Sequence, residues 1–145
     1  MNDSGRAART VDLIALLHTA HTAQAEVESK LSGLGLSLPK LLALKALSEA
    51  GESLPLGQLA DRLSCVKSNI TQLVDRLEAD GFVARKADPA DRRTKLAVLT
   101  ARGRKACRDG ARLQQETERH LLRTLTGDEA RQLAGLLDKL ARPYG

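Results

Sequence analysis

Apolar residues recur at helical spacing through the first third of the chain. A broad apolar face runs through residues 8–31, and a second apolar face runs through residues 38–50, where Gly51 suits a helix end. Between them, SGLGLSLP (32–39) carries the glycines and the proline of a helix break. The pattern predicts a long first helix, which contacts more than one neighbour because its apolar face is wide, and a shorter second helix.

The middle of the chain holds two short amphipathic segments with a break near residues 64–66. Their apolar stripes consist of Leu56, Leu59, Ala60 and Leu63 in the first segment, and of Ile70, Leu73, Val74 and Leu77 in the second, which ends at Gly81. The second stripe follows the i, i+3, i+4, i+7 spacing of a helix that buries one side. Two such helices joined by a tight turn predict a helix-turn-helix.

Alternation replaces helical spacing after Gly81. Residues 82–87 and 94–99 each read as a strand, and the Asp88-Pro89 step between them starts a turn. A hairpin that directly follows a helix-turn-helix predicts a winged helix-turn-helix. The expected fold class is therefore mainly α with one small β-hairpin.

The last third of the chain returns to helix. Thr100 is suited to cap a helix over about 101–124, and Thr126 to cap a final helix with Asp128 and Glu129 in its first turn. The apolar stripe of the final helix is Leu133, Leu136, Leu137 and Leu140. This stripe and the wide face of the first helix need a partner surface that one such subunit does not supply, which predicts self-association.

Composition narrows the class of protein. The 145 residues suit a single subunit, and 42% hydrophobic with 1% aromatic residues predicts an aliphatic core. A net charge of +5 and a pI of about 9.6 fit a polyanionic partner. No apolar run approaches the ~18 residues of a membrane helix and no secretory signal is evident, so we expect a cytoplasmic protein without membrane contact.

The second helix of the motif has the side chains of a DNA-reading helix. Its polar positions are Lys67, Ser68, Asn69, Thr71, Gln72 and Arg76, and the first acidic residue is Asp75. Asn and Gln can bond adenine in two places, Arg can do so with guanine, and Lys, Ser and Thr suit phosphates or base edges. Although any solvated helix face is polar, the scarcity of acids favours contact with DNA in the major groove.

The hairpin tip is rich in charge. Arg92 and Arg93 lie where a wing would meet the narrow, negative minor groove, which attracts inserted arginine. We expect Asp91 to orient an arginine through a charge-assisted hydrogen bond. In isolation the same sequence would fit an ordinary exposed turn.

The run from Leu56 to Gly103 resembles the MarR family (multiple antibiotic resistance regulators). The resemblance is carried by Asp91-Arg92-Arg93 followed by LAVLT and Ala-Arg-Gly103, and by LADRLSCVKSNITQLVDRLEADGFVAR before them. It extends more loosely to SLPKLLALKALSEAG and LTGDEARQLAGLLDKL, and so covers nearly the whole chain.

The resemblance implies a homodimeric transcription regulator, usually a repressor. It implies that 8–35 and 101–145 form the dimerisation helices and that 36–100 form the winged DNA-binding region of one subunit, 1–145. A two-fold dimer would bind a pseudo-palindromic operator in double-stranded DNA. Members of the family often respond to a small-molecule effector or, through cysteine, to oxidants.

Other chemistry has weaker support. Cys65 precedes the reading helix and is either a redox-sensitive thiol or a small apolar residue of the turn, and Cys107 is expected to be inert. His18 and His21 are more consistent with an interface pair than with a metal site, so we expect no metal and no cofactor. No nucleophile elbow or phosphate loop is present, so we do not expect an enzyme. A winged-helix module that binds protein or RNA remains the alternative.

Overall fold

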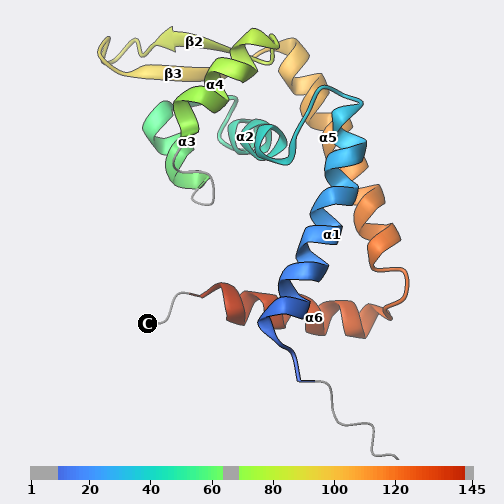
Figure 1. Ribbon diagram of the computed structural model, residues 1–145. Helices are drawn as coiled ribbons and strands as arrows, with labels where there is room; N and C mark the ends of the chain where they lie inside the picture. The colour runs from blue at the N-terminus through green and yellow to red at the C-terminus, as the bar shows by residue number, and fades with distance from the viewer. Residues whose placement is uncertain (1–9, 64–68, 143–145) are drawn as a thin grey trace, which may run out of the picture.

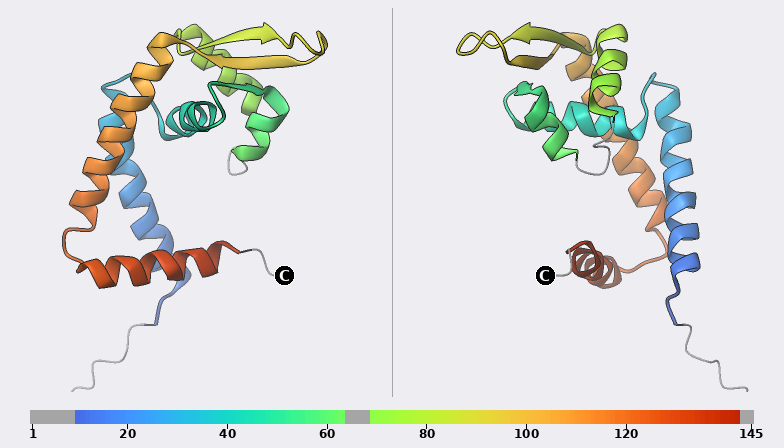
Figure 2. Two further views of the ribbon diagram at one scale, coloured as in Figure 1. Left: turned by 180° about the vertical axis from the view of Figure 1, so that it is seen from behind. Right: turned by 60° about the vertical axis from the view of Figure 1, so that its left-hand side comes forward.

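A winged lobe, formed by residues 38–99, lies at one end of two long helices. The computed structural model describes residues 10–63 and 69–142. Helices α1 (Leu13–Ser32) and α5 (Ala101–Leu121) run side by side away from the lobe, and α6 (Gly127–Ala141) crosses at their far end (Figure 1). The two further views show the same separation between lobe and α6 (Figure 2). The chain thus has one end built around the wing and one end built around exposed helices.

Side chains at the helix starts fix the boundaries of the long helices. Asp12 accepts a hydrogen bond from the Ala15 N–H at 2.7 Å, so α1 begins at Leu13 and the predicted start at residue 8 was too early. Thr100 caps α5 through the Gly103 N–H at 3.0 Å, as predicted, although α5 ends at Leu121 and not near 124. Thr126 also caps α6 as predicted, in a reciprocal capping box with Glu129.

The winged lobe contains three short helices and a small sheet. Its elements are α2 (Leu38–Glu49), β1 (Ser53–Pro55), α3 (Leu56–Arg62), α4 (Ile70–Ala79), β2 (Val83–Ala87) and β3 (Lys95–Leu99). Both predicted strands exist and pair antiparallel, with Arg85 opposite Ala97. The sheet order is β1-β3-β2, and β1 is a third strand that the sequence pattern did not predict. It is three residues long and ends in proline, so it carries almost no alternation to detect.

The core is aliphatic and lies around α2. Leu41, Leu44 and Leu47 of that helix are fully buried, together with Leu31 from α1 and Leu77 from α4. This arrangement follows from the composition, since aromatic residues are nearly absent. Helix α2 therefore holds α4, the long helices and the sheet in one packed unit.

Large apolar side chains remain exposed at the end away from the wing. The exposed set is Val11, Leu13, Ile14, Leu16 and Leu17 near the start of α1, Leu121 and Leu122 at the end of α5, and Leu133, Leu136, Leu137 and Leu140 on α6. No residue of α6 is buried. Within the described residues, no helix is both long and apolar enough to cross a bilayer. The apolar surface is therefore concentrated on helices that a single subunit leaves uncovered.

Candidate nucleic-acid interface

Helix α4 is strongly amphipathic and presents a polar outer side. Leu73, Val74 and Leu77 are buried against the lobe. The helix ends where Gly81 adopts a left-handed backbone conformation (φ 77°), which glycine enters without steric cost. Asn69 is the N-cap residue and therefore stands just before the helix. Its side chain makes no capping hydrogen bond. The predicted residues Lys67 and Ser68, and also Cys65, lie outside the described residues.

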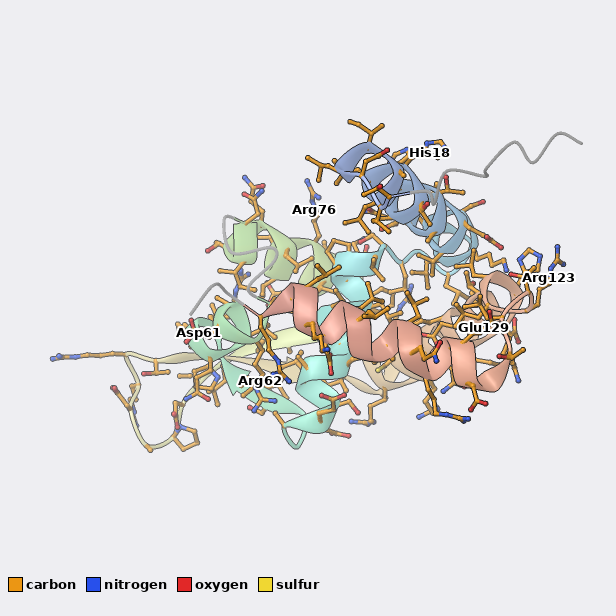
Figure 3. The ribbon with its side chains drawn as sticks, turned by 90° about the horizontal axis from the view of Figure 1, so that it is seen from below. His18, Asp61, Arg62, Arg76, Arg123 and Glu129 are labelled. Atoms are coloured by element: carbon orange, nitrogen blue, oxygen red, sulfur yellow. The ribbon has the colours of Figure 1, made fainter. Side chains whose placement is uncertain are left out.

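The outer side of α4 divides into two stripes. Gln72 and Arg76 share one stripe, and both side chains are exposed. Figure 3 shows Arg76 pointing away from the ribbon, on the side of α4 opposite the wing strands. Thr71 belongs to the second stripe with Asp75 and Glu78, which faces β2. Of the predicted reading residues, Thr71, Gln72 and Arg76 thus lie on α4, but not all on the same stripe.

The wing is the β2–β3 hairpin with a tip closed by backbone hydrogen bonds. The Asp88 N–H donates to the Thr94 carbonyl at 2.9 Å, and the Thr94 N–H donates to the Asp91 carbonyl at 2.9 Å. Asp88 also accepts from the Ala90 N–H at 2.9 Å, as expected of a turn starter. Arg92 and Arg93 are exposed at this tip, which extends beyond the rest of the lobe (Figure 1).

Asp91 acts on the backbone of the tip. Its carboxylate accepts from the Arg93 N–H at 3.1 Å and from the Thr94 hydroxyl at 3.3 Å. The sequence prediction was that Asp91 orients an arginine through a charge-assisted hydrogen bond, and the donor found is the backbone N–H of Arg93, with the Thr94 hydroxyl as a second donor. A short acidic side chain in a turn reaches a nearby N–H more easily than the end of a long, solvated arginine. Asp91 therefore shapes the turn that displays the two arginines.

Arg85 on β2 contacts α4 directly, and sequence reasoning did not single out this residue. Its guanidinium lies 2.6 Å from the Asp75 carboxylate and 3.2 Å from the Glu78 carboxylate. The hydrogen bond to Asp75, reinforced by the two negative charges, raises the pKa of Arg85 above its ordinary value. The signal available in the sequence was the pair of acids at i and i+3 on the helix that precedes an arginine-bearing strand.

Thr100 links the end of α4, the wing and α5. Its hydroxyl donates to the Gly81 carbonyl at 2.6 Å, and its backbone N–H donates to the Phe82 carbonyl at 3.1 Å. Lys40 of α2 pairs with Asp80 at 2.8 Å, at the end of α4. The position of α4 is therefore fixed at its C-terminal end by contacts from two other helices.

Two apolar grooves lie along the long helices. The larger, of about 700 Å³, is lined from α1, α5 and α6 by residues that include Leu16, His18, Leu121 and Leu137. A groove of about 390 Å³ lies between α1, α2 and α5 beside Val27. Within the described residues, no group of three or more His, Cys, Asp or Glu side chains could hold a metal ion. Both grooves are suited to apolar occupants.

Comparison with known proteins identifies the family. The sequence model described as "MarR family" matches residues 36–95, from the end of the α1–α2 connection to the wing. The HTH-type transcriptional repressor Rv2887 of Mycobacterium tuberculosis is 33% identical over 115 residues, which are 79% of this chain and 82% of the relative. The chain belongs to the MarR family. Its MarR-type lobe is the part with the wing, and the relative's coverage extends into the helices beyond it.

Solved structures agree with this membership. A cysteine-to-serine mutant of MarR from E. coli, in complex with operator DNA, superposes with a TM-score of 0.79 at 27% identity, over 90% of this chain and 94% of that chain. A probable transcriptional regulator from Pseudomonas aeruginosa superposes with a TM-score of 0.78 at 31% identity, over 88% and 94%. The predicted winged helix-turn-helix is thus confirmed for this MarR-family chain.

Proposed function

We propose that this chain represses transcription by binding a pseudo-palindromic operator in double-stranded DNA as a homodimer. The observation that carries the proposal is the pairing of an exposed Gln72/Arg76 stripe on α4 with a wing that ends in Arg92 and Arg93. The E. coli MarR mutant, described in complex with operator DNA, shares the fold over 90% of this chain and supports the assignment. Its action on DNA would place the protein in the cytoplasm.

In this proposal α4 enters the major groove. Gln72 can bond adenine through two hydrogen bonds and Arg76 can do the same with guanine, so these two side chains read bases. Asn69 and Thr71, with Lys67 and Ser68 before them, contact phosphates or base edges and fix the position of the helix. The basic balance of the chain, +5, supplies the long-range attraction to the phosphate backbone.

The wing reaches the adjacent minor groove. Arg92 and Arg93 are held at a turn whose backbone is fixed by Asp91, and an arginine placed in this way favours a narrow, negative groove. The wing therefore adds affinity and a preference for groove shape, while α4 adds preference for particular bases.

A second copy of the chain is the expected partner of the exposed helices. The apolar side chains of α1 and α6 are uncovered in one subunit, and α6 buries none of its own residues. Two-fold pairing through these helices covers that surface and places two copies of α4 on one side of the dimer. Half-sites about one helical turn apart, or ~34 Å, follow from such symmetry.

Release of DNA would require a signal. The groove of about 700 Å³ beside Leu16 and Leu137 is large enough for a small apolar effector. Its binding would change the position of the winged lobes relative to the long helices. Oxidation of Cys65 is the second hypothesis, because added bulk next to the reading helix would disturb its fit in the groove.

Selection from a random pool tests the proposed function. Purified protein would be mixed with duplex DNA of random sequence, and the bound fraction amplified and sequenced over several rounds. We expect enrichment of a two-fold symmetric motif. Failure to enrich any motif would overturn operator binding. Displacement of bound duplex by structured RNA at equal concentration would favour the alternative, a winged-helix module for RNA, and capture of a protein without DNA binding would favour one for protein.

A further inference from the structure

We propose that Arg85 is a positioning residue of the DNA interface. From β2 it holds the wing-facing stripe of α4 in place and neutralises the two carboxylates on that stripe. The inference rests on the proposed binding of duplex DNA, and it assigns to Arg85 an action through α4 and not a contact with bases. Its basis is a set of contacts that joins the reading helix directly to the first strand of the wing.

The contacts of Arg85 extend along almost the whole of α4. One terminal nitrogen, Nη2, donates to Asp75 Oδ1 at 2.6 Å and to the Thr71 carbonyl at 3.4 Å. The other, Nη1, donates to Glu78 Oε1 at 3.2 Å, and the backbone N–H of Arg85 donates to Glu78 Oε2 at 3.0 Å. Thr71, Asp75 and Glu78 are separated by four and three residues, so they form one stripe. A planar guanidinium can bond to all three residues because its N–H donors are held in a fixed, forked arrangement.

The same contacts change the electrostatics of the outer side of α4. Asp75 and Glu78 keep 58% and 44% of their side-chain surface exposed, so without a partner they would face the phosphates as two negative charges. Arg85 is 25% exposed and places one positive charge between them. An isolated surface ion pair contributes little, but here one rigid cation bonds two acids and a carbonyl on a single helix.

The geometry leaves one stripe of α4 free. The inner side is packed through Leu73, Val74 and Leu77, and the wing-facing stripe is bonded to Arg85. Gln72 and Arg76 lie on the remaining stripe, where neither side chain bonds to any other described residue. Figure 3 shows Arg76 pointing away from the lobe. Rotation of α4 about its axis would break the contacts of Arg85, so this residue fixes which side chains face the DNA. It also makes α4 and the wing move as one unit.

Four variants separate charge from positioning. Each would be titrated by fluorescence anisotropy against a duplex selected by the wild-type protein and against its scrambled counterpart. The variants are Arg85→Ala, Arg85→Lys, the triple variant Arg85→Ala/Asp75→Asn/Glu78→Gln, and Arg112→Ala as the control that removes one exposed arginine from α5. The ratio of the affinities for the two duplexes measures sequence discrimination, which depends on the positioning of α4. The affinity for the scrambled duplex alone measures the electrostatic contribution to binding.

We expect Arg85→Ala to weaken binding to both duplexes by about tenfold, with a further loss on the selected sequence. The triple variant should recover affinity for the scrambled duplex, because it removes the repulsion between the two carboxylates and the phosphates. It should not recover discrimination, because the hydrogen bonds of the Arg85 guanidinium to α4 are still missing. Arg85→Lys should likewise keep charge and lose discrimination. Arg112→Ala should match the wild type to within about twofold on both duplexes, since it lies away from α4.

Two results would overturn the inference. In the first, the triple variant binds DNA as weakly as Arg85→Ala, and its plot of log affinity against log salt is shallower than that of wild type by about 0.9. That difference in slope marks the loss of one direct phosphate contact. The other is unchanged discrimination in all Arg85 variants. Amide hydrogen exchange on free protein supplies a readout without DNA: Arg85→Ala should speed exchange in α4 more than in α5. If wild-type protein binds no duplex, the proposed function fails, and this exchange pattern still decides whether Arg85 holds α4.

Discussion

The carboxylate of Asp91 and the backbone N–H of Arg93 form a 3.1 Å hydrogen bond at the tip of the wing. The same carboxylate accepts from the Thr94 hydroxyl, and the Asp88 carboxylate accepts from the Ala90 N–H. Two acidic residues are therefore used to fold the turn, although they lie in a segment proposed to approach DNA. Their bonds hold the backbone from which Arg92 and Arg93 project, so the local fold and the proposed function depend on the same carboxylates.

Removal of the Asp91 carboxylate should weaken DNA binding. Asp91→Ala loses both hydrogen bonds at the tip, and the arginines must then be ordered on binding, so we expect a loss of about 0.5–1.5 kcal/mol in binding free energy. Asp91→Asn keeps one carbonyl acceptor for the Arg93 N–H and serves as the matched control. Isothermal titration with a selected duplex measures both. Tighter binding by Asp91→Ala would show that repulsion of phosphate outweighs the turn.

Gly103 should be intolerant of any side chain. A Cβ at this position would overlap the Phe82 carbonyl oxygen and lie 2.9 Å from Leu99 Cδ1, because α5 starts directly against the wing. We expect Gly103→Ala to lower the free energy of unfolding by about 1–3 kcal/mol or more. Gly135→Ala on α6 meets no atom within 4 Å and should raise it by up to about 1 kcal/mol. Urea denaturation of both variants checks the contrast, and equal stabilities would contradict the close contact.

A charge on the apolar stripe of α6 should separate the subunits. Leu136 is 57% exposed in one subunit, so Leu136→Asp does not disturb the core and acts on whatever covers this helix. We expect a monomer by light scattering at micromolar concentration, together with loss of operator binding. Asp138→Lys, on the opposite side of α6, is the control and should stay dimeric. A dimeric Leu136→Asp protein would remove this stripe from the interface.

The Cys107 thiol should react slowly. Desolvation by burial raises its pKa, with a smaller opposing effect from Lys45, so the neutral thiol is favoured in the folded state. This contribution to stability is present below the ordinary thiol pKa and is lost as pH rises through the higher folded-state pKa. In a Cys65→Ser variant Cys107 is the remaining cysteine. Its alkylation at pH 7 should be slower in native protein than in urea, and should accelerate in alkaline solution.

Equal alkylation rates with and without urea would contradict the burial of Cys107. The reciprocal variant, Cys107→Ser, isolates Cys65. Peroxide should then lower DNA affinity in Cys107→Ser but not in Cys65→Ser if the redox hypothesis holds. An equal loss in both variants would exclude Cys65 as the sensor.

Periodic features of the sequence predicted most of the fold. The stripe Ile70, Leu73, Val74, Leu77 located α4, because a helix that buries one side must repeat apolar residues every three or four positions. Thr100 and Thr126 located the starts of α5 and α6, because a capping hydroxyl acts on N–H groups only a few residues away. Features that depend on local sequence alone could therefore be predicted.

Features that depend on contacts between residues distant in sequence could not be predicted from the sequence. Strand β1 exists because Leu54 lies opposite Ala97, a pairing that its own three residues do not specify. Arg85 reads as an ordinary strand residue until α4 is placed beside β2, and only then do Asp75 and Glu78 become its partners. The sequence predicted that Asp91 orients an arginine, but it did not specify which atom the carboxylate bonds, and the turn geometry selects the backbone N–H of Arg93.

The most direct test of the proposed DNA binding is its salt dependence in wild type and in Arg93→Ala. Affinity for a selected duplex would be measured by anisotropy over a series of salt concentrations, with the scrambled duplex as control. We expect a linear fall of log affinity with log salt for both proteins. We also expect Arg93→Ala to lose about 1–3 kcal/mol of binding free energy, and wild type to prefer the selected sequence clearly. Wild-type binding that is indifferent to salt and to sequence would contradict binding of an operator through the wing and α4.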